Sequence, residues 1–191
     1  SFSMVTIMMG WYSTVALAAY QIVLTFVTLT FQVACGIASA TTILVSPAFG
    51  RRDKTEVSCY SMSGLHLSFL SMGISALCFI FFGRQITSLF STDIDVIRQG
   101  AMLFVVAGAF QLFDGAQSTL LGALRGINDV TKPMKYSFLS YILFAIPMAY
   151  CLGFLFGFGP CGILSGEALG LMLAALLYYR RLRKSTSAMK L

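Results

Sequence analysis

Positively charged residues are clustered at alternate gaps between long apolar runs of this chain, and this arrangement constrains its fold more than any other feature. Eleven of the thirteen Lys and Arg residues form three clusters: Arg51, Arg52 and Lys54; Arg125, Lys132 and Lys135; and Arg180, Arg181, Arg183, Lys184 and Lys190. Because short loops rich in Lys and Arg stay on the cytoplasmic side during insertion, these gaps are predicted to be cytoplasmic and the gaps between them external. The pattern is typical of a multi-span membrane protein with one orientation.

Composition indicates the same class of protein. Hydrophobic residues make up 58% of the 191 residues and charged residues 10%, which leaves too little polar surface to cover a water-soluble domain of this length. The net charge of +6 is confined to short loops and a tail, so lipid headgroups explain it better than nucleic acid does. We therefore expect membrane lipid as a partner and no nucleic acid.

Apolar runs divide the chain into one short helix and five full spans. Residues 1–14 are too short to cross a hydrocarbon core of about 30 Å, so they are expected to be the end of a helix whose beginning is absent. Full spans are predicted at 16–49, 56–82, 95–122, 134–156 and 161–180. The sequence thus predicts an all-α integral membrane helix bundle over residues 1–182 and a basic cytoplasmic tail over 183–191.

Three local patterns refine this outline. Ile86, Leu89 and Phe90 recur at helical spacing and predict a short amphipathic turn at the membrane interface, within 84–95. Residues 50–53 and 126–129 share a Gly-x-x-Asp pattern, which indicates related turn geometry. The last span carries glycines at 162, 166 and 170, a double GxxxG run that predicts close approach of another helix backbone.

Asp114 is the one acidic residue near the middle of a predicted span. It lies about 4 Å along the helix axis from the midpoint between Arg98 and Arg125, which mark the helix ends. A carboxylate at this depth costs about 2.5–3.5 kcal/mol on insertion scales, so such residues face the bundle interior or a water-filled cavity. Gln111 and Ser118 share its helix face and Gln117 flanks it. We expect Asp114 to be a cation or proton site; hydrogen bonding between helices is the alternative role for these polar groups.

Other polar residues are less informative. Gln21 lies inside the first full span and is predicted, with Gln111, Gln117 and Ser118, to line a cavity. Glu167 is expected near the external end of the last helix, where it either reaches interfacial water or has a functional role. His66 has no acidic residue or second histidine one turn away, so no metal site and no catalytic residue is predicted.

Four segments in order resemble one known family. They are residues 10–21 (GWYSTVALAAYQ), the run 36–50, the motif FQLFDGAQ at 110–117 and GALRGIND at 122–129. Together they resemble the carboxy-terminal lobe of multidrug and toxic compound extrusion (MATE) transporters, and the Phe-Asp-Gly-x-Gln motif is similar to the NorM-like bacterial branch. Two departures are Tyr20, where many members have His, and Ser46-Pro47, where Gly-Gln is common.

The resemblance implies one six-helix lobe, with its first helix truncated, of a twelve-helix transporter. On that mapping the chain holds the end of helix 7 at 1–14, helix 8 at 16–49, helix 9 at 56–82, helix 10 at 95–122, helix 11 at 134–156 and helix 12 at 161–180. It further implies a secondary antiporter in the bacterial inner membrane, with a cytoplasmic carboxy terminus. Such an antiporter exports cationic amphipathic drugs or toxic compounds in exchange for Na⁺ or H⁺, and no cofactor is expected besides that coupling ion. Asp114 corresponds to the cation-coupling aspartate of helix 10, and the amino-terminal lobe, absent here, is the expected partner.

Other functions stay open at this point. A lipid-linked oligosaccharide flippase of the same superfamily would share the helix count, but it should carry basic residues inside its cavity, and no predicted span has Lys or Arg at its middle. A non-transporting structural subunit is a second alternative. An enzyme is not expected, because one histidine and scattered carboxylates provide no nucleophile with a paired acid and base.

Overall fold

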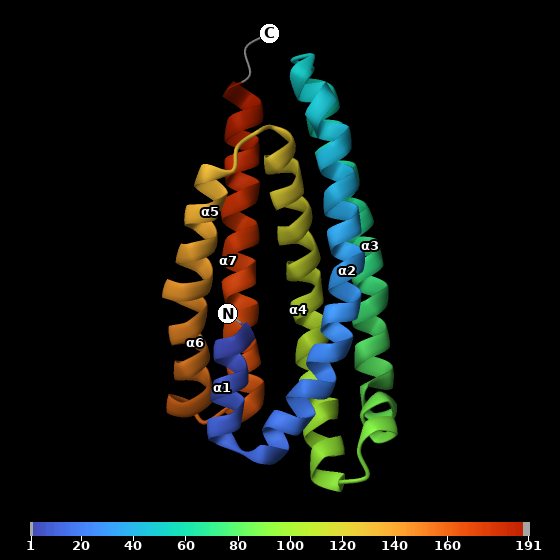
Figure 1. Cartoon of the computed structure of the whole chain (residues 1–191), viewed down its shortest axis with the longest axis vertical. Coiled ribbons are helices and arrows are strands. Elements are labelled where there is room, and N and C mark those ends of the chain that lie inside the picture. The colour runs from blue at the N-terminus through green and yellow to red at the C-terminus, as the bar shows by residue number, and fades with distance from the viewer. Residues whose placement is uncertain (1, 189–191) are drawn as a thin grey trace.

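The computed structural model describes residues 2–188, and all regular structure in that part of the chain is helical. The elements are α1 (Phe2–Tyr12), α2 (Thr14–Gly50), α3 (Lys54–Phe90), α4 (Ile94–Gly126), α5 (Thr131–Phe138), η1 (Leu139–Ala145), α6 (Ile146–Tyr150), η2 (Cys151–Leu155) and α7 (Gly159–Ala188). Figure 1 shows the long helices running antiparallel to one another along the long axis of the molecule. The predicted all-α class is confirmed.

Five segments are long and apolar enough to cross a membrane, namely α2, α3, α4, the continuous run Thr131–Leu155 and α7. The run Thr131–Leu155 comprises α5, η1, α6 and η2. By contrast, α1 has 11 residues and is about 16 Å long, roughly half the hydrocarbon thickness. The described chain therefore has the predicted form of one short helix followed by five full spans.

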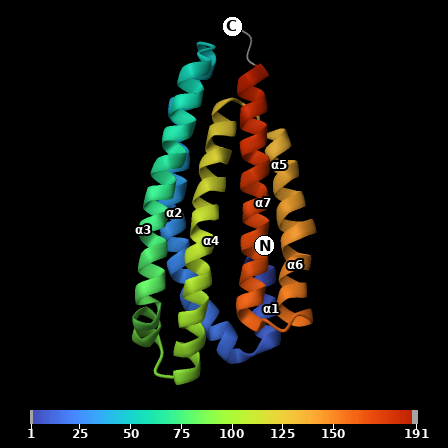
Figure 2. The same ribbon diagram turned by 180° about the vertical axis from the view of Figure 1, so that it is seen from behind.

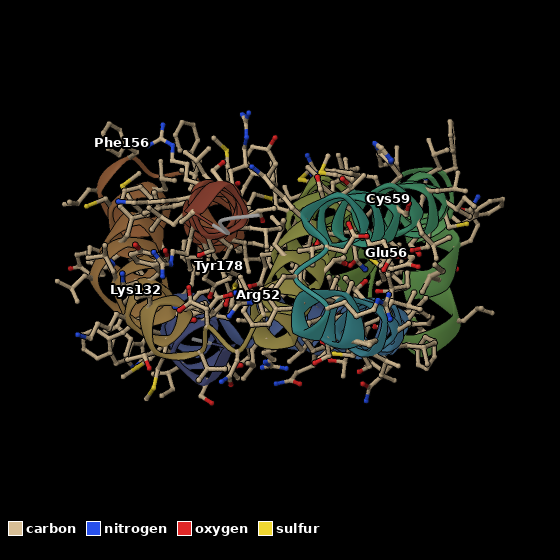
Figure 3. The ribbon with its side chains drawn as sticks, turned by 90° about the horizontal axis from the view of Figure 1, so that it is seen from above. Arg52, Glu56, Cys59, Lys132, Phe156 and Tyr178 are labelled. Carbon is tan, nitrogen blue, oxygen red and sulfur yellow. The ribbon has the colours of Figure 1, made fainter. Side chains whose placement is uncertain are left out.

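The basic clusters lie at one end of the bundle. In Figure 1 the α2–α3 turn, the α4–α5 turn and the last part of α7 all lie at the top, whereas the α1–α2, α3–α4 and η2–α7 junctions lie at the bottom. Figure 3 looks onto the basic end, where Arg52 and Lys132 are labelled. Lys190 and the end of the predicted tail lie outside the described residues. The described clusters thus share one side, as alternate gaps of a multi-span protein should.

The two turns with the Gly-x-x-Asp pattern have the same geometry. Arg52 and Asn128 both have φ of 58°, the left-handed conformation that ends many helices. The amide of Asp53 donates to the carbonyl of Ala48 at 3.0 Å, and the amide of Asp129 donates to the carbonyl of Leu124 at 2.9 Å. These bonds span six residues, as in a Schellman motif, so the predicted relation between the two turns is confirmed.

Two helices continue well past the predicted limits of their membrane spans. α3 continues to Phe90 instead of ending at 82, because the residues of the expected amphipathic turn contain no Gly or Pro after Gly83 that would end a helix. α7 continues to Ala188, so the described part of the predicted tail continues the last helix. Arg and Lys are good helix formers, and Arg181 is anchored to Asp129 of the α4–α5 turn by a bond of 2.5 Å.

The fifth span is not a regular α-helix, because π-helical segments η1 and η2 flank the short α6. Pro147 lies within α6 and has no N–H to donate to the carbonyl of Leu143. The wider i→i+5 pattern on both sides of the proline is a known response of a helix to such a loss. Sequence analysis predicted the span but not its irregular backbone.

α4 and α7 form the centre of the lobe. α4 packs against α2, α3 and α7, and α7 packs against the η1–α6–η2 segment, an arrangement that Figures 1 and 2 show from both sides. A side chain at Gly166 would clash with the backbone of Ala149 in α6, so the GxxxG run permits the close contact predicted for it. α4 and α7 are therefore the two spans with the largest shares of buried residues, 44% and 56% of their apolar windows.

Candidate functional site

Asp114 lies at the buried centre of α4, with 2% of its surface exposed. Gln111, Gln117 and Ser118 on the same helix are also buried, and Gln117 interacts with the Asp114 carboxyl group. The structure therefore gathers four of the five residues singled out for the site along one helix. Their predicted role in cation coupling stays a prediction.

Gln21 lies apart from these residues. Its side chain is exposed on α2, whereas its neighbour Tyr20 is buried on the opposite side of the helix. The recorded contact of Gln21 is through its backbone, since its carbonyl accepts a hydrogen bond of 2.9 Å from Thr25. Within this lobe the structure does not bring Gln21 to Asp114.

Glu167 of α7 is a second buried carboxylate beside Asp114, which sequence analysis missed. Only 1% of its surface is exposed, so the expectation that it reaches interfacial water is wrong. It lies close enough to Asp114 for the two carboxylates to repel each other. Two buried apolar residues on the same face of α7, Ile163 and Leu171, lie one turn before and one turn after it. This place in an apolar stripe is the signal in the sequence that could have found Glu167.

Two tyrosines from other elements approach this pair of acids. Tyr141 of η1 interacts electrostatically with both Asp114 and Glu167. Tyr20 of α2 interacts with Glu167. We call Asp114, Glu167, Tyr20 and Tyr141 the acid cluster. It draws on α2, α4, η1 and α7, so residues far apart in the sequence meet at the α4–α7 interface.

Several oxygen atoms around the acid cluster are buried without a hydrogen-bond donor among the described residues. They include Oδ2 of Asp114 and the side-chain carbonyl oxygens of Gln111 and Gln117. The amide nitrogen of Gln111 donates to the hydroxyl of Thr30 on α2, which leaves its oxygen free. Leaving a buried polar atom unsatisfied costs about 1–3 kcal/mol. A cation bound by these oxygens would remove that cost.

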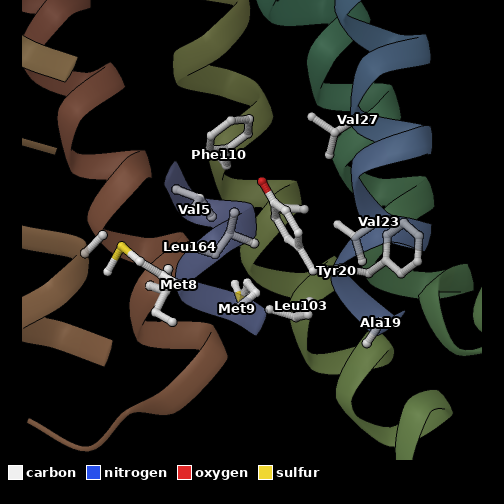
Figure 4. Close-up of a cluster of buried hydrophobic side chains, with 14 of the residues drawn as sticks. Val5, Met8, Met9, Ala19, Tyr20, Val23, Val27, Leu103, Phe110 and Leu164 are labelled. Carbon is white, nitrogen blue, oxygen red and sulfur yellow. The ribbon is translucent and has the colours of Figure 1, made fainter. Parts of the chain in front are cut away.

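An apolar cluster adjoins the acids on the side of α1 and α2. Figure 4 shows Tyr20 extending from α2 toward Phe110 of α4, with Val5, Met9 and Leu164 around it. Such surroundings lower the local dielectric and make an uncompensated charge expensive. The acid cluster is therefore a place where a positive charge is strongly favoured.

His66 takes no part in this arrangement. Its side chain is exposed on α3, and the described residues contain no group of three or more His, Cys, Asp or Glu side chains that could hold a metal ion. The acid cluster provides oxygen atoms from two carboxylates, amides and hydroxyls, a set suited to a hard cation or a proton.

Comparison with known proteins identifies the family. The model of the MatE family matches residues 1–151. The chain belongs to the MATE family. It is 32% identical to the probable multidrug resistance protein NorM of Rhizobium meliloti (strain 1021), over 98% of this chain and 42% of that protein. It is 35% identical to the protein of the same name from Rhodopseudomonas palustris (strain ATCC BAA-98 / CGA009), over 91% of this chain and 38% of that protein.

The fold agrees with the assignment to the MATE family. An outward-facing structure of a multidrug resistance MATE family transporter superposes with a TM-score of 0.90 at 16% identity, over 98% of this chain and 42% of that one. At this identity the likeness concerns the fold alone. The chain spans about two fifths of the length of these MATE relatives.

Proposed function

We infer that this chain acts as the carboxy-terminal lobe of a secondary antiporter that exports cationic amphipathic compounds in exchange for Na⁺ or H⁺. The observation that carries the proposal is the carboxylate of Asp114, buried in the middle of a membrane-spanning helix with one oxygen that has no donor among the described residues. Relatives carry the name multidrug resistance protein, which supports a drug as cargo. Their greater length supports a second lobe as partner.

The proposed mechanism is competition for negative charge. When the coupling cation occupies the site of Asp114, the cavity is neutral and a cationic compound gains little from entering. When the cation leaves, the carboxylate favours the compound, and the two lobes rock about the cavity to expose it to the other side. Each cargo therefore crosses in exchange for the coupling ion.

Cationic cargo fits the charges of the described lobe better than an anionic lipid-linked oligosaccharide does. Arg84 and Arg98 lie toward the end of the bundle opposite the basic clusters, and Arg125 lies in the last turn of α4 with an exposed side chain. The described spans thus have no Lys or Arg at their middle, whereas α4 buries an acid and two amides there. We place the basic end in the bacterial cytoplasm, following the positive-inside rule.

The test is efflux of ethidium or norfloxacin from cells that produce the complete two-lobed transporter, with imposed Na⁺ or H⁺ gradients. Asp114→Asn should abolish gradient-driven efflux, whereas Asp95→Asn, an exposed acid in the first turn of the same helix, should not. Efflux that persists unchanged in Asp114→Asn would refute the role of Asp114. Lack of efflux by the unaltered protein under any gradient would favour the flippase or a structural subunit.

A further inference from the structure

Glu167 is the buried acid to which the proposed mechanism gives no role. It lies on α7, one residue after Gly166, whose own face packs on the backbone of α6. Glu167 is directed instead to the interior, since it interacts with Asp114 of α4, Tyr20 of α2 and Tyr141 of η1. The packed helices α4 and α7 therefore bury two carboxylates that interact electrostatically with each other.

Two neighbouring carboxylates in an apolar interior cannot both remain charged without a compensating positive charge. The Lys and Arg residues of the described chain lie in the turns or within about three turns of the ends of the spans. Arg125, on the same helix as Asp114, is about 16 Å away along the helix axis. The groups of α2 and η1 that interact with the pair are Tyr20, Cys35 and Tyr141, which are neutral donors and acceptors. A proton on one of the acids or a bound cation can supply this compensation, and the oxygen atoms around the pair favour a cation.

Amide oxygens on the helix of Asp114 are candidates for further ligands. Gln117 interacts with Asp114, and its carbonyl oxygen and that of Gln111 are more than nine-tenths buried with no donor among the described side chains and backbone. Neutral amide oxygens beside carboxylates are the ligand set of a hard, dehydrated cation. The site is thus more than a pair of acids.

We propose that Glu167 is a second carboxylate of the coupling site, so that Asp114 and Glu167 hold one monovalent cation between α4 and α7. The proposal deepens the antiporter function and rests on it for its role in transport, but the binding of the cation can be tested separately. Because the two acids lie on different helices, the bound cation also links α4 to α7. Its release removes the positive charge that both acids share, so that their repulsion or the protonation of one acid gives ion release a physical means of altering helix packing.

The first test measures binding rather than transport. Purified complete transporter is titrated with NaCl at constant ionic strength, with choline chloride as replacement, and its thermal unfolding is followed; a parallel series varies pH without Na⁺. A ligand that binds only the folded state raises the unfolding temperature with concentration. Glu167→Gln should weaken the cation dependence by about tenfold or more, as Asp114→Asn should, whereas Asp95→Asn should match the unaltered protein.

Stability without the cation separates this role from a purely structural one. Glu167→Gln keeps the size of the side chain and removes one of two repelling charges, so the cation-free variant should unfold at the same or a higher temperature. Glu167→Asp keeps the charge and should retain part of the cation dependence. A lower cation-free stability with an unchanged response to both Na⁺ and H⁺ would overturn the proposal.

Efflux then distinguishes the two proposals. In one outcome, efflux by the unaltered protein depends on Asp114, but the cation concentration for half-maximal efflux is unchanged in Glu167→Gln. This outcome would refute the proposed role of Glu167 and support the proposed antiporter function. In the other outcome, cation binding depends on Glu167, but no drug efflux occurs under any gradient. This outcome would support the two-carboxylate cation site and refute the proposed export of cationic drugs.

Discussion

Arg181 of α7 donates a hydrogen bond from Nε to Oδ2 of Asp129, at 2.5 Å, and so ties the last helix to the α4–α5 turn. Both side chains are largely buried, with 19% and 15% of their surfaces exposed. A bond between charged groups with little exposure to water is worth more than a surface ion pair, about 1.5–3 kcal/mol. We expect Arg181→Met to lower the unfolding temperature of the purified transporter by several degrees.

A double-mutant cycle tests whether this loss comes from the pair. Asp129→Asn alone should destabilise by a similar amount, and the double variant should lose much less than the sum. Arg51→Met with Glu56→Gln is the matched control, because that ion pair is exposed at the α2–α3 turn and should contribute little. Additive effects at Arg181 and Asp129 would show that the bond contributes nothing to stability.

Close packing of α2 on α4 gives a second prediction. A Cβ at Gly122 would clash with the backbone carbonyl of Ala38, and Thr42 donates to the carbonyl of Gly122 at 2.8 Å. Gly122→Ala should therefore force the helices apart and reduce stability by about 1–3 kcal/mol. Gly36→Ala on α2 is the control, because a Cβ there meets open space and alanine favours the helix by about 1 kcal/mol. Thermal unfolding of the two variants checks the contrast, and equal effects would contradict it.

Much of the fold was predictable because helix ends carry local signals. Ser13, Asp53 and Asp93 each accept a hydrogen bond from the first turn of the following helix, which is the chemistry expected of these residue types. Helix ends that depend on tertiary contacts were not predicted from the sequence. The continuation of α7 past Arg180 is anchored by Asp129, a residue far away in the sequence, and no local pattern reports that bond.

The candidate site was predictable only where one helix defines it. Asp114 stands out as an acid within an apolar run, and its neighbours follow from the period of the helix. Glu167 was misplaced because its depth from the helix end said nothing about its burial, which is produced by α4 and the surrounding helices. Gln21 is exposed on α2, whose buried face is formed by Tyr20, Val23 and Val27, so its predicted place in the lining of a cavity stays a prediction.

Orientation in the membrane can be tested with introduced cysteines. The turns at 91–93 and 127–130 lie at opposite ends of the bundle in Figure 1, and Thr92 and Asn128 are exposed in them. In a variant without the five native cysteines, Thr92→Cys should react with a membrane-impermeant maleimide in intact spheroplasts, because its turn is predicted to be external. Asn128→Cys should react only after the membrane is opened. The reverse result would overturn the predicted orientation.

The link between Thr30 and Gln111 connects the apolar cluster of α2 to the helix of Asp114. Thr30 accepts from the Gln111 amide and donates its own hydrogen to the carbonyl of Phe26 or Val27, at 3.1 or 2.9 Å. Thr30→Val keeps the side-chain shape but removes the acceptor, which leaves the buried Gln111 amide without its partner and should cost about 1–3 kcal/mol. Thermal unfolding of the purified transporter measures this loss.

Thr28→Val is the matched control for that change, because Thr28 lies on the same helix with an exposed side chain whose recorded bond is to its own helix, at 2.7 Å to Leu24. It should leave stability nearly unchanged. If the bond also holds the Gln111 oxygen beside Asp114, Thr30→Val should in addition weaken the stabilisation by the coupling cation, and Thr28→Val should not. A loss of stability in Thr30→Val without a change in cation response would confine the role of this bond to packing, because the ligand oxygens would then be held in place by α4 itself.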